Sequence, residues 1–142
     1  MKGLLSGCLF KEQIMIITDQ DEIMSFARDR WRDNPKPSYV AMDWSDFCYH
    51  NAAEPQKILV RAASDVSLSD AIDHLYMEIK SLGDLEPRTV IFGLSEKTPS
   101  LTMQQLLDCR QSISELIPEG THLLQEVLWS DRTEAVALLF ME

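Results

Sequence analysis

The pattern of apolar and polar residues is clearest between residues 57 and 96. Residues 57–63 form a predominantly apolar run, as buried strands do, and residues 89–93 form another. Between them apolar side chains recur at helical spacing, at Leu68, Ile72, Leu75, Tyr76, Ile79 and Leu82. Ser67 is placed to cap the start of this helix and Gly83 its end. The segment therefore predicts a β-α-β unit, which indicates the α/β class.

The flanking sequence predicts further elements of both kinds. Strands are expected at 13–18 and 39–42, a helix from about residue 19 to 33, and a helix at 98–117. Two apolar segments, 121–129 and 134–141, are separated by a four-residue polar turn and predict a C-terminal antiparallel β-hairpin. Together these elements predict a two-layer sandwich in which three helices pack on a mixed sheet of about six strands. We expect residues 1–142 to form a single α/β domain, with an α+β arrangement as the open alternative.

The composition narrows the classes of partner. Thirteen lysine and arginine residues against twenty-three aspartate and glutamate residues give a formal charge of −10. Such a charge repels phosphate backbones and anionic lipid, so we expect neither nucleic-acid nor membrane binding. Three widely spaced cysteines predict no disulfide framework and fit a reducing, cytoplasmic compartment. No run approaches the roughly 20 apolar residues that span a bilayer.

The densest group of candidate ligands is Asp43, Asp46, Cys48 and His50, which follows the predicted strand at 39–42. Two carboxylates and an imidazole could hold a divalent cation or transfer protons. Their spacing matches no closed metal motif, however, and acidic residues after a strand commonly just begin a solvated loop. No cofactor motif is present, and we expect no cofactor. Trp44 lies within this group and Trp129 near another strand end, where exposed tryptophans would anchor a protein interface.

Several of these segments, taken together, resemble the C-terminal domain of the tubulin/FtsZ family. The segments are 57–61, 65–71, 90–93 and 134–138, and their order is similar as well. Asp43-Trp44-Ser45-Asp46-Phe47 is similar to the family's acidic loop, whose carboxylates reach GTP bound to a neighbouring subunit. The resemblance implies that Asp43 and Asp46 take the place of those carboxylates.

The sequence also departs from the family. It has no glycine-rich nucleotide-binding segment, so the GTPase domain is absent, and Ala41 stands where the family's loop usually has asparagine. The stretch between Phe47 and Lys57 leaves no room for the helix that the family places there, and the helix expected at 98–117 is an addition.

Two functions follow as hypotheses. The first is a non-enzymatic protein-interaction or assembly module that binds a protein partner or a second copy of itself. The alternative is a small metal- or ligand-dependent enzyme or binder that uses Asp43, Asp46 and His50. A third possibility, an acidic mimic that occupies a nucleic-acid-binding protein, requires the carboxylates of residues 65–134 to form one continuous strip.

Overall fold

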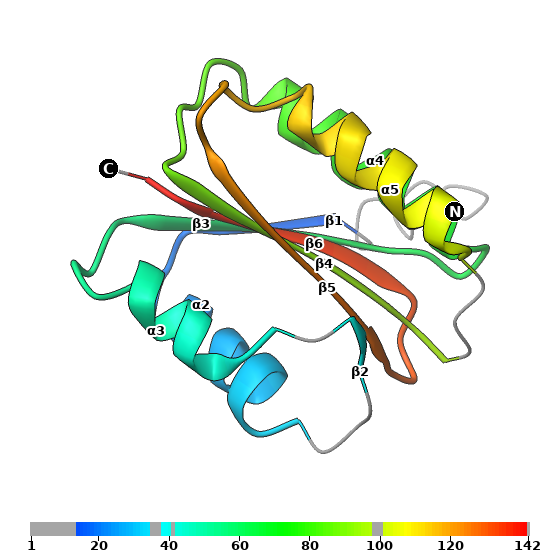
Figure 1. Cartoon of the computed structure of the whole chain (residues 1–142), viewed down its shortest axis with the longest axis horizontal. Coiled ribbons are helices and arrows are strands. Elements are labelled where there is room, and N and C mark those ends of the chain that lie inside the picture. The colour runs from blue at the N-terminus through cyan, green and yellow to red at the C-terminus, as the bar shows by residue number, and fades with distance from the viewer. Residues whose placement is uncertain (1–13, 35–37, 41, 98–100, 142) are drawn as a thin grey trace, which may run out of the picture.

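The computed structural model of the chain describes residues 14–34, 38–40, 42–97 and 101–141. These residues build one mixed sheet of six strands in the order β1-β3-β6-β4-β5-β2 (Figure 1). The strands are β1 (Ile14–Ile17), β2 (Ser38–Val40), β3 (Lys57–Ala63), β4 (Thr89–Glu96), β5 (His122–Trp129) and β6 (Glu134–Phe140). The α-helices are α2 (Gln20–Ala27), α3 (Trp44–His50), α4 (Leu68–Ser81) and α5 (Met103–Ser114), and α2 continues into a π-helical segment, η1 (Arg28–Arg32).

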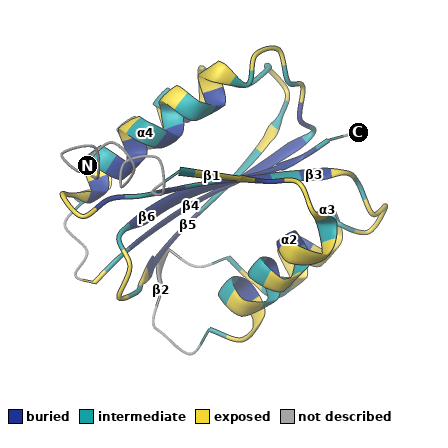
Figure 2. Ribbon diagram, turned by 180° about the vertical axis from the view of Figure 1, so that it is seen from behind, coloured by how far each residue is buried: buried dark blue, intermediate teal, exposed yellow. Residues whose placement is uncertain are grey.

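Helices cover both faces of the sheet. α4 and α5 lie on one face, and α2, η1 and α3 lie on the other (Figure 1). Neighbouring residues of a strand therefore point into different cores: Val60 packs under α4 while Leu59 packs on the opposite side. β6 is buried along its whole length, and the central strands form the most buried part of the molecule (Figure 2). A strand covered on both faces needs an unbroken apolar sequence, which is what residues 135–140 supply.

The predicted α/β class and the mixed sheet of six strands are confirmed. The helices form two layers rather than one, so the molecule has three layers instead of the two expected. The difference comes partly from α3, a helix of 7 residues that buries only Phe47. A helix that short with one buried side chain has no apolar stripe for periodicity to reveal. It begins before the stretch between Phe47 and Lys57 that we expected to be too short for a helix, and it ends within that stretch at His50.

The predicted C-terminal hairpin is wrong, because β4 lies between β5 and β6. β5 pairs with β4 in parallel, with Thr89 opposite His122, and β6 pairs with β4 antiparallel, with Thr89 opposite Phe140. The turn at 130–133 crosses the end of β4 instead of joining adjacent strands. It is tied there, because Ser130 N–H donates to the Glu96 carbonyl at 3.0 Å and Ser95 Oγ donates to the Arg132 carbonyl at 3.1 Å.

The start of a helix was predicted correctly where the sequence contains a recognisable capping residue. Ser67 Oγ accepts from Asp70 N–H at 3.1 Å, so the predicted cap of α4 is confirmed. α5 begins later than expected: its cap is Thr102, which accepts from Gln105 N–H, while residues 98–100 lie outside the described residues. Among the described residues, no helix is long and apolar enough to cross a bilayer.

Candidate functional site

Asp43 and Asp46 lie at the start of α3, not at the end of a strand. Strand β2 ends at Val40, Asp43 is the N-cap of α3, and the Asp46 carboxylate accepts from Asp43 N–H at 3.2 Å. Both side chains are exposed. Their first role is therefore to begin the helix, because carboxylates at this end satisfy free backbone N–H groups and oppose the positive end of the helix dipole.

One aromatic cluster holds α3 on the sheet. Phe47 is fully buried, and its ring lies 4.8 Å from that of Trp44, 5.8 Å from that of Trp31 and 5.7 Å from that of Phe140. Trp44 itself is only partly buried, with the Arg32 guanidinium 5.9 Å from its ring. One side of Trp44, the predicted interface anchor, therefore packs on Phe47, and the side chain remains partly accessible to solvent.

His50 lies at the C-terminal end of α3, one helical turn after Asp46 and at the opposite end from Asp43. Asp43 and His50 are separated by the whole helix, roughly 10 Å at a rise of about 1.5 Å per residue. Within the described part of the chain, no group of three or more histidine, cysteine or acidic side chains is placed to hold a metal ion. Cys48 is exposed on the same helix. The group that looked dense in sequence is therefore spread along the helix, with Asp43 and His50 at its opposite ends.

Trp129, the second predicted anchor, ends β5 and is 40% exposed. It lies opposite Glu96 in the sheet, on a different element from Trp44.

The surroundings of His50 come from distant parts of the sequence. His50 Nδ1 lies 3.2 Å from Thr89 Oγ1, its carbonyl accepts from Arg88 Nη2 at 2.9 Å, and its ring is centred 5.9 Å from that of His122. These groups line a hollow of about 340 Å³. Burial lowers the pKa of His50, the nearby His122 and Arg88 lower it further, and Asp46 opposes them. Sequence inspection missed this group because Arg88 and His122 belong to two other elements.

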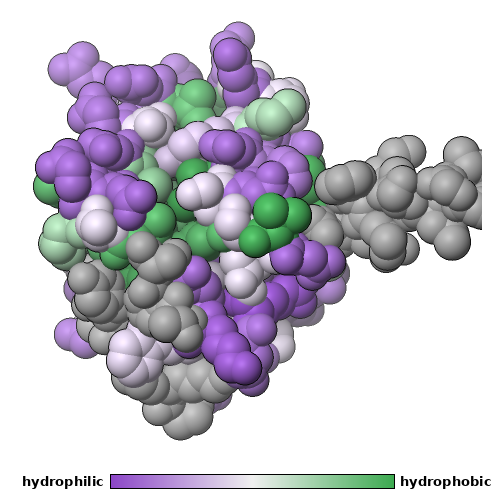
Figure 3. All heavy atoms as spheres, turned by 90° about the vertical axis from the view of Figure 1, so that its right-hand side faces the viewer, coloured by the Kyte–Doolittle hydropathy of each residue, from purple (hydrophilic) through white to green (hydrophobic). Residues whose placement is uncertain are grey.

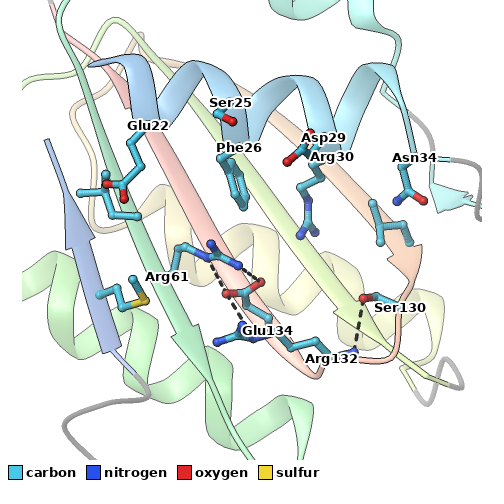
Figure 4. Close-up of a pocket in the computed structure, with 13 residues that line it drawn as sticks. Glu22, Ser25, Phe26, Asp29, Arg30, Asn34, Arg61, Ser130, Arg132 and Glu134 are labelled. Carbon is cyan, nitrogen blue, oxygen red and sulfur yellow. Dashed lines mark hydrogen bonds and ion pairs between the residues drawn. The ribbon is translucent and has the colours of Figure 1, made fainter. Parts of the chain in front are cut away.

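A second hollow, of about 410 Å³, lies between α2–η1 and the strands that they cross (Figure 4). Its polar lining includes Arg61, which donates two hydrogen bonds of 2.7 and 3.1 Å to the Glu134 carboxylate. Arg132 lies 3.9 Å from the same carboxylate, and the Arg61 guanidinium is 4.7 Å from the ring centre of Phe26. The arginines are thus paired with carboxylates of the protein itself, which makes this hollow electrically balanced.

Beneath that hollow lies a buried ion pair between Arg30 on η1 and Glu126 on β5. Arg30 Nε donates to Glu126 Oε1 at 2.5 Å, and their side chains are only 8% and 2% exposed. The pair occupies the space above Gly93, where a Cβ would lie 2.5 Å from Glu126 Oε1. Burial raises the pKa of Glu126 and the Arg30 guanidinium opposes that rise. A glutamate inside an apolar strand and a glycine in the middle of another were the signals that could have revealed it.

Comparison with known proteins adds a likeness of fold. No protein-family model matches the chain, and no curated protein matches it. A solved structure described as an empty FtsZ dimer from M. jannaschii is similar over 74% of this chain, with a TM-score of 0.55 and 10% sequence identity. This chain covers 32% of that one, so it spans about a third of the length of the structure that it matches. At this identity the likeness concerns the fold alone: the chain has an open, mixed α/β sheet whose architecture is similar to part of FtsZ.

Proposed function

We propose that the protein is a non-enzymatic interaction or assembly module, and that α3 with its capping residues is its contact surface. The observation that carries the proposal is the exposure of α3. The helix is attached through Phe47, while Tyr49 is 77% exposed and Asp43, Asp46 and Cys48 are exposed as well. A helix that is fixed on one side and open on the other presents its side chains from a backbone that needs no further ordering on binding.

The side chains on α3 also suggest the chemistry of the partner. Trp44 and Tyr49 supply large aromatic surfaces, and such residues carry much of the binding energy in protein interfaces. Asp43 and Asp46 add negative charge beside Trp44, in a chain whose formal charge is −10. A partner surface with a hydrophobic pocket and a basic rim would complement this arrangement.

The likeness to FtsZ supports assembly as the context. The similar structure is described as a dimer. We propose further that the chain corresponds to the C-terminal domain of the tubulin/FtsZ family, with Asp43 and Asp46 in the place of the family's acidic loop. In that family the loop faces a neighbouring subunit, and here the segment begins an exposed helix. The partner in this proposal is a second copy of the chain or another protein.

Other surfaces support the proposal less well. The side of the molecule drawn in Figure 3 shows apolar side chains near its middle, bordered by hydrophilic ones above and below. Small apolar areas of this kind are normal on a monomer and need no partner to explain them.

The experiment is a comparison of exposed aromatic and control variants of the purified chain. Light scattering after size exclusion measures the mass of wild type, Trp44→Ala, Tyr49→Ala and the control Met77→Ala, whose side chain is 69% exposed on α4 across the sheet. We expect a concentration-dependent oligomer, or one complex with a defined partner, that both aromatic variants lose and Met77→Ala keeps. Equal behaviour of Tyr49→Ala and Met77→Ala would show that α3 is not the contact surface.

A pair of conservative changes separates the alternative based on Asp43, Asp46 and His50. Asparagine caps a helix about as well as aspartate, so Asp43→Asn with Asp46→Asn removes both charges and leaves α3 formed. If the protein is a metal-dependent binder, this double variant loses any response to a divalent cation. If it is an interaction module, the variant still associates, but more slowly and with less dependence on salt.

A further inference from the structure

We propose that the hollow between the C-terminal end of α3 and the first residues of β4 and β5 binds a small phosphoryl anion, either inorganic phosphate or the phosphate of a small ester. The hollow is lined by Tyr49, His50, Ala52, Ala53, Arg88, Thr89 and His122. Four of these side chains can donate hydrogen bonds to an oxyanion or carry positive charge there: Arg88, His50, His122 and Tyr49.

The charge of this hollow is opposite to that of the molecule. The chain carries a formal charge of −10, yet no carboxylate is among the described residues that line this space. The larger hollow beside Arg61 differs, because its guanidinium groups face Glu134 and Glu126. In a protein with this excess of acidic residues, a lining of one arginine and two histidines without a carboxylate is the local environment that an anion requires.

Arg88 is held in place by a hydrogen bond that uses one of its donors. Its Nη2 donates to the His50 carbonyl at 2.9 Å. A guanidinium has five N–H donors in a planar fork, which suits the oxygens of a phosphoryl group. The same bond satisfies a carbonyl at the C-terminal end of α3, so the negative end of that short helix is offset where the anion would lie.

The two imidazoles complete the site. Thr89 is fully buried, and its Oγ1 lies 3.2 Å from His50 Nδ1, which leaves Nε2 as the nitrogen of His50 that a ligand can use. The His122 ring lies 5.9 Å from that of His50, close enough for one anion to contact both. Two neighbouring imidazoles repel each other when both are protonated, and a bound dianion removes this penalty.

The size of the hollow limits the ligand. Its volume of about 340 Å³ is near the lower end of the range of about 300–1,000 Å³ that small-molecule pockets span. Inorganic phosphate or a small ester fits this space better than a large cofactor does.

Nuclear magnetic resonance of the full chain tests the proposal directly. The imidazole signals are followed while inorganic phosphate, and separately glycerol phosphate, is added at constant ionic strength. We expect saturable shifts at His50 and His122 and none at His74, which is on α4 and lies 3.8 Å from Asp70. His74 is thus a control within the same molecule. Tighter binding of the ester than of free phosphate would identify an ester as the ligand, and the reverse would identify inorganic phosphate.

The pH dependence gives a second readout. Binding of an anion raises the pKa of His50 from its lowered value, so phosphate binds more tightly as a decreasing pH protonates His50. The charged groups that act on His50 are Arg88 before β4, His122 on β5 and Asp46 on its own helix.

A matched pair of arginine variants assigns the binding to this place. Arg88→Gln removes the charge and keeps a shorter polar side chain, and we expect at least about tenfold weaker binding. Arg110→Gln is the control, because Arg110 Nη2 likewise donates to a backbone carbonyl, that of Leu123 at 3.0 Å, from the exposed surface of α5. Thermal unfolding confirms that both variants are folded.

Three results would overturn the proposal. One is an absence of saturable shifts at His50 and His122 with either phosphate compound. Another is equal weakening by Arg88→Gln and Arg110→Gln, which would indicate nonspecific attraction. The third is a response of both histidines to zinc chloride without any response to phosphate, which would indicate a metal site instead.

Discussion

Replacing Arg30 with methionine should destabilise the protein far more than replacing any exposed arginine. The Arg30 and Glu126 side chains are 8% and 2% exposed, and Arg30 Nε donates to Glu126 Oε1. In Arg30→Met the Glu126 carboxylate stays buried without its opposite charge. Breaking a buried pair in this way costs about 3–5 kcal/mol, which is a large share of the roughly 5–15 kcal/mol that stabilises a typical domain.

A double variant separates the effect of charge from that of packing. In Arg30→Met combined with Glu126→Gln, the buried group is a neutral amide, whose unsatisfied burial costs about 1–3 kcal/mol. We therefore expect the double variant to be more stable than the single one. Urea unfolding measures the free energy of unfolding of both variants. An unchanged slope of this free energy against urea concentration shows that both variants expose the same amount of surface on unfolding.

The pH dependence of the single variant has a definite sign. Burial raises the pKa of Glu126 in the folded protein, and Arg30 opposes that rise. A raised carboxyl pKa favours the folded state at acidic pH, and this contribution is lost as the pH increases through the folded-state pKa. Since Arg30→Met removes the opposing charge, the pKa of Glu126 rises further. The variant should therefore lose less stability at mildly acidic pH than above neutral pH.

Arg32→Met is the matched control, because Arg32 belongs to the same π-helical segment but is exposed and pairs with Asp33 at the surface. We expect it to change stability little. Equal costs for Arg30→Met and for the double variant, or no difference between Arg30→Met and Arg32→Met, would refute the reasoning.

Three further predictions follow from other contacts. Gly93→Ala should lower the free energy of unfolding by about 1–3 kcal/mol, because the new Cβ would lie 2.5 Å from Glu126 Oε1; an unchanged urea midpoint would contradict this. Phe47→Ala should cost about 3–5 kcal/mol and increase amide hydrogen exchange in α3 first, since Phe47 is the buried residue of that helix; uniform exchange across the sheet would argue otherwise. Cys48 is exposed, whereas burial raises the pKa of Cys109, so a thiol reagent followed by peptide mapping should modify Cys48 faster, and the opposite order would count against the structure.

The elements that were predicted correctly from the sequence are those with a local periodicity of apolar residues. β3 and α4 were predicted almost as they occur, because helical spacing, apolar runs and a capping serine are properties of a few consecutive residues. β4 was predicted to end at Gly93, but it continues to Glu96. α3 was missed for the same reason: it has one buried side chain, so its sequence has no repeat to read. Its acidic residues were noticed as candidate ligands, and the structure places them at the start of a helix.

The candidate sites depended on contacts that no local pattern contains. Arg30 and Glu126 are 96 residues apart, and the Arg88–His50 contact joins residues 38 apart. His50 was identified as a candidate, but the groups that surround it come from the starts of β4 and β5. His50 was therefore identified from the sequence, but the residues that surround it were not.

The amino-acid sequence by itself determined where elements such as β3 and α4 lie and which of their faces are buried, because propensity, capping and side-chain periodicity act over a single turn or a few strand residues. Only the tertiary structure decided that β4 lies between β5 and β6, that helices cover both faces, and that Arg88 meets two histidines. The apolar sequences of β4 and β6 are compatible with several neighbours, and the choice among them depends on how the apolar surface of the whole chain is buried. Strand order and long-range polar contacts are therefore set by the packing of all elements together.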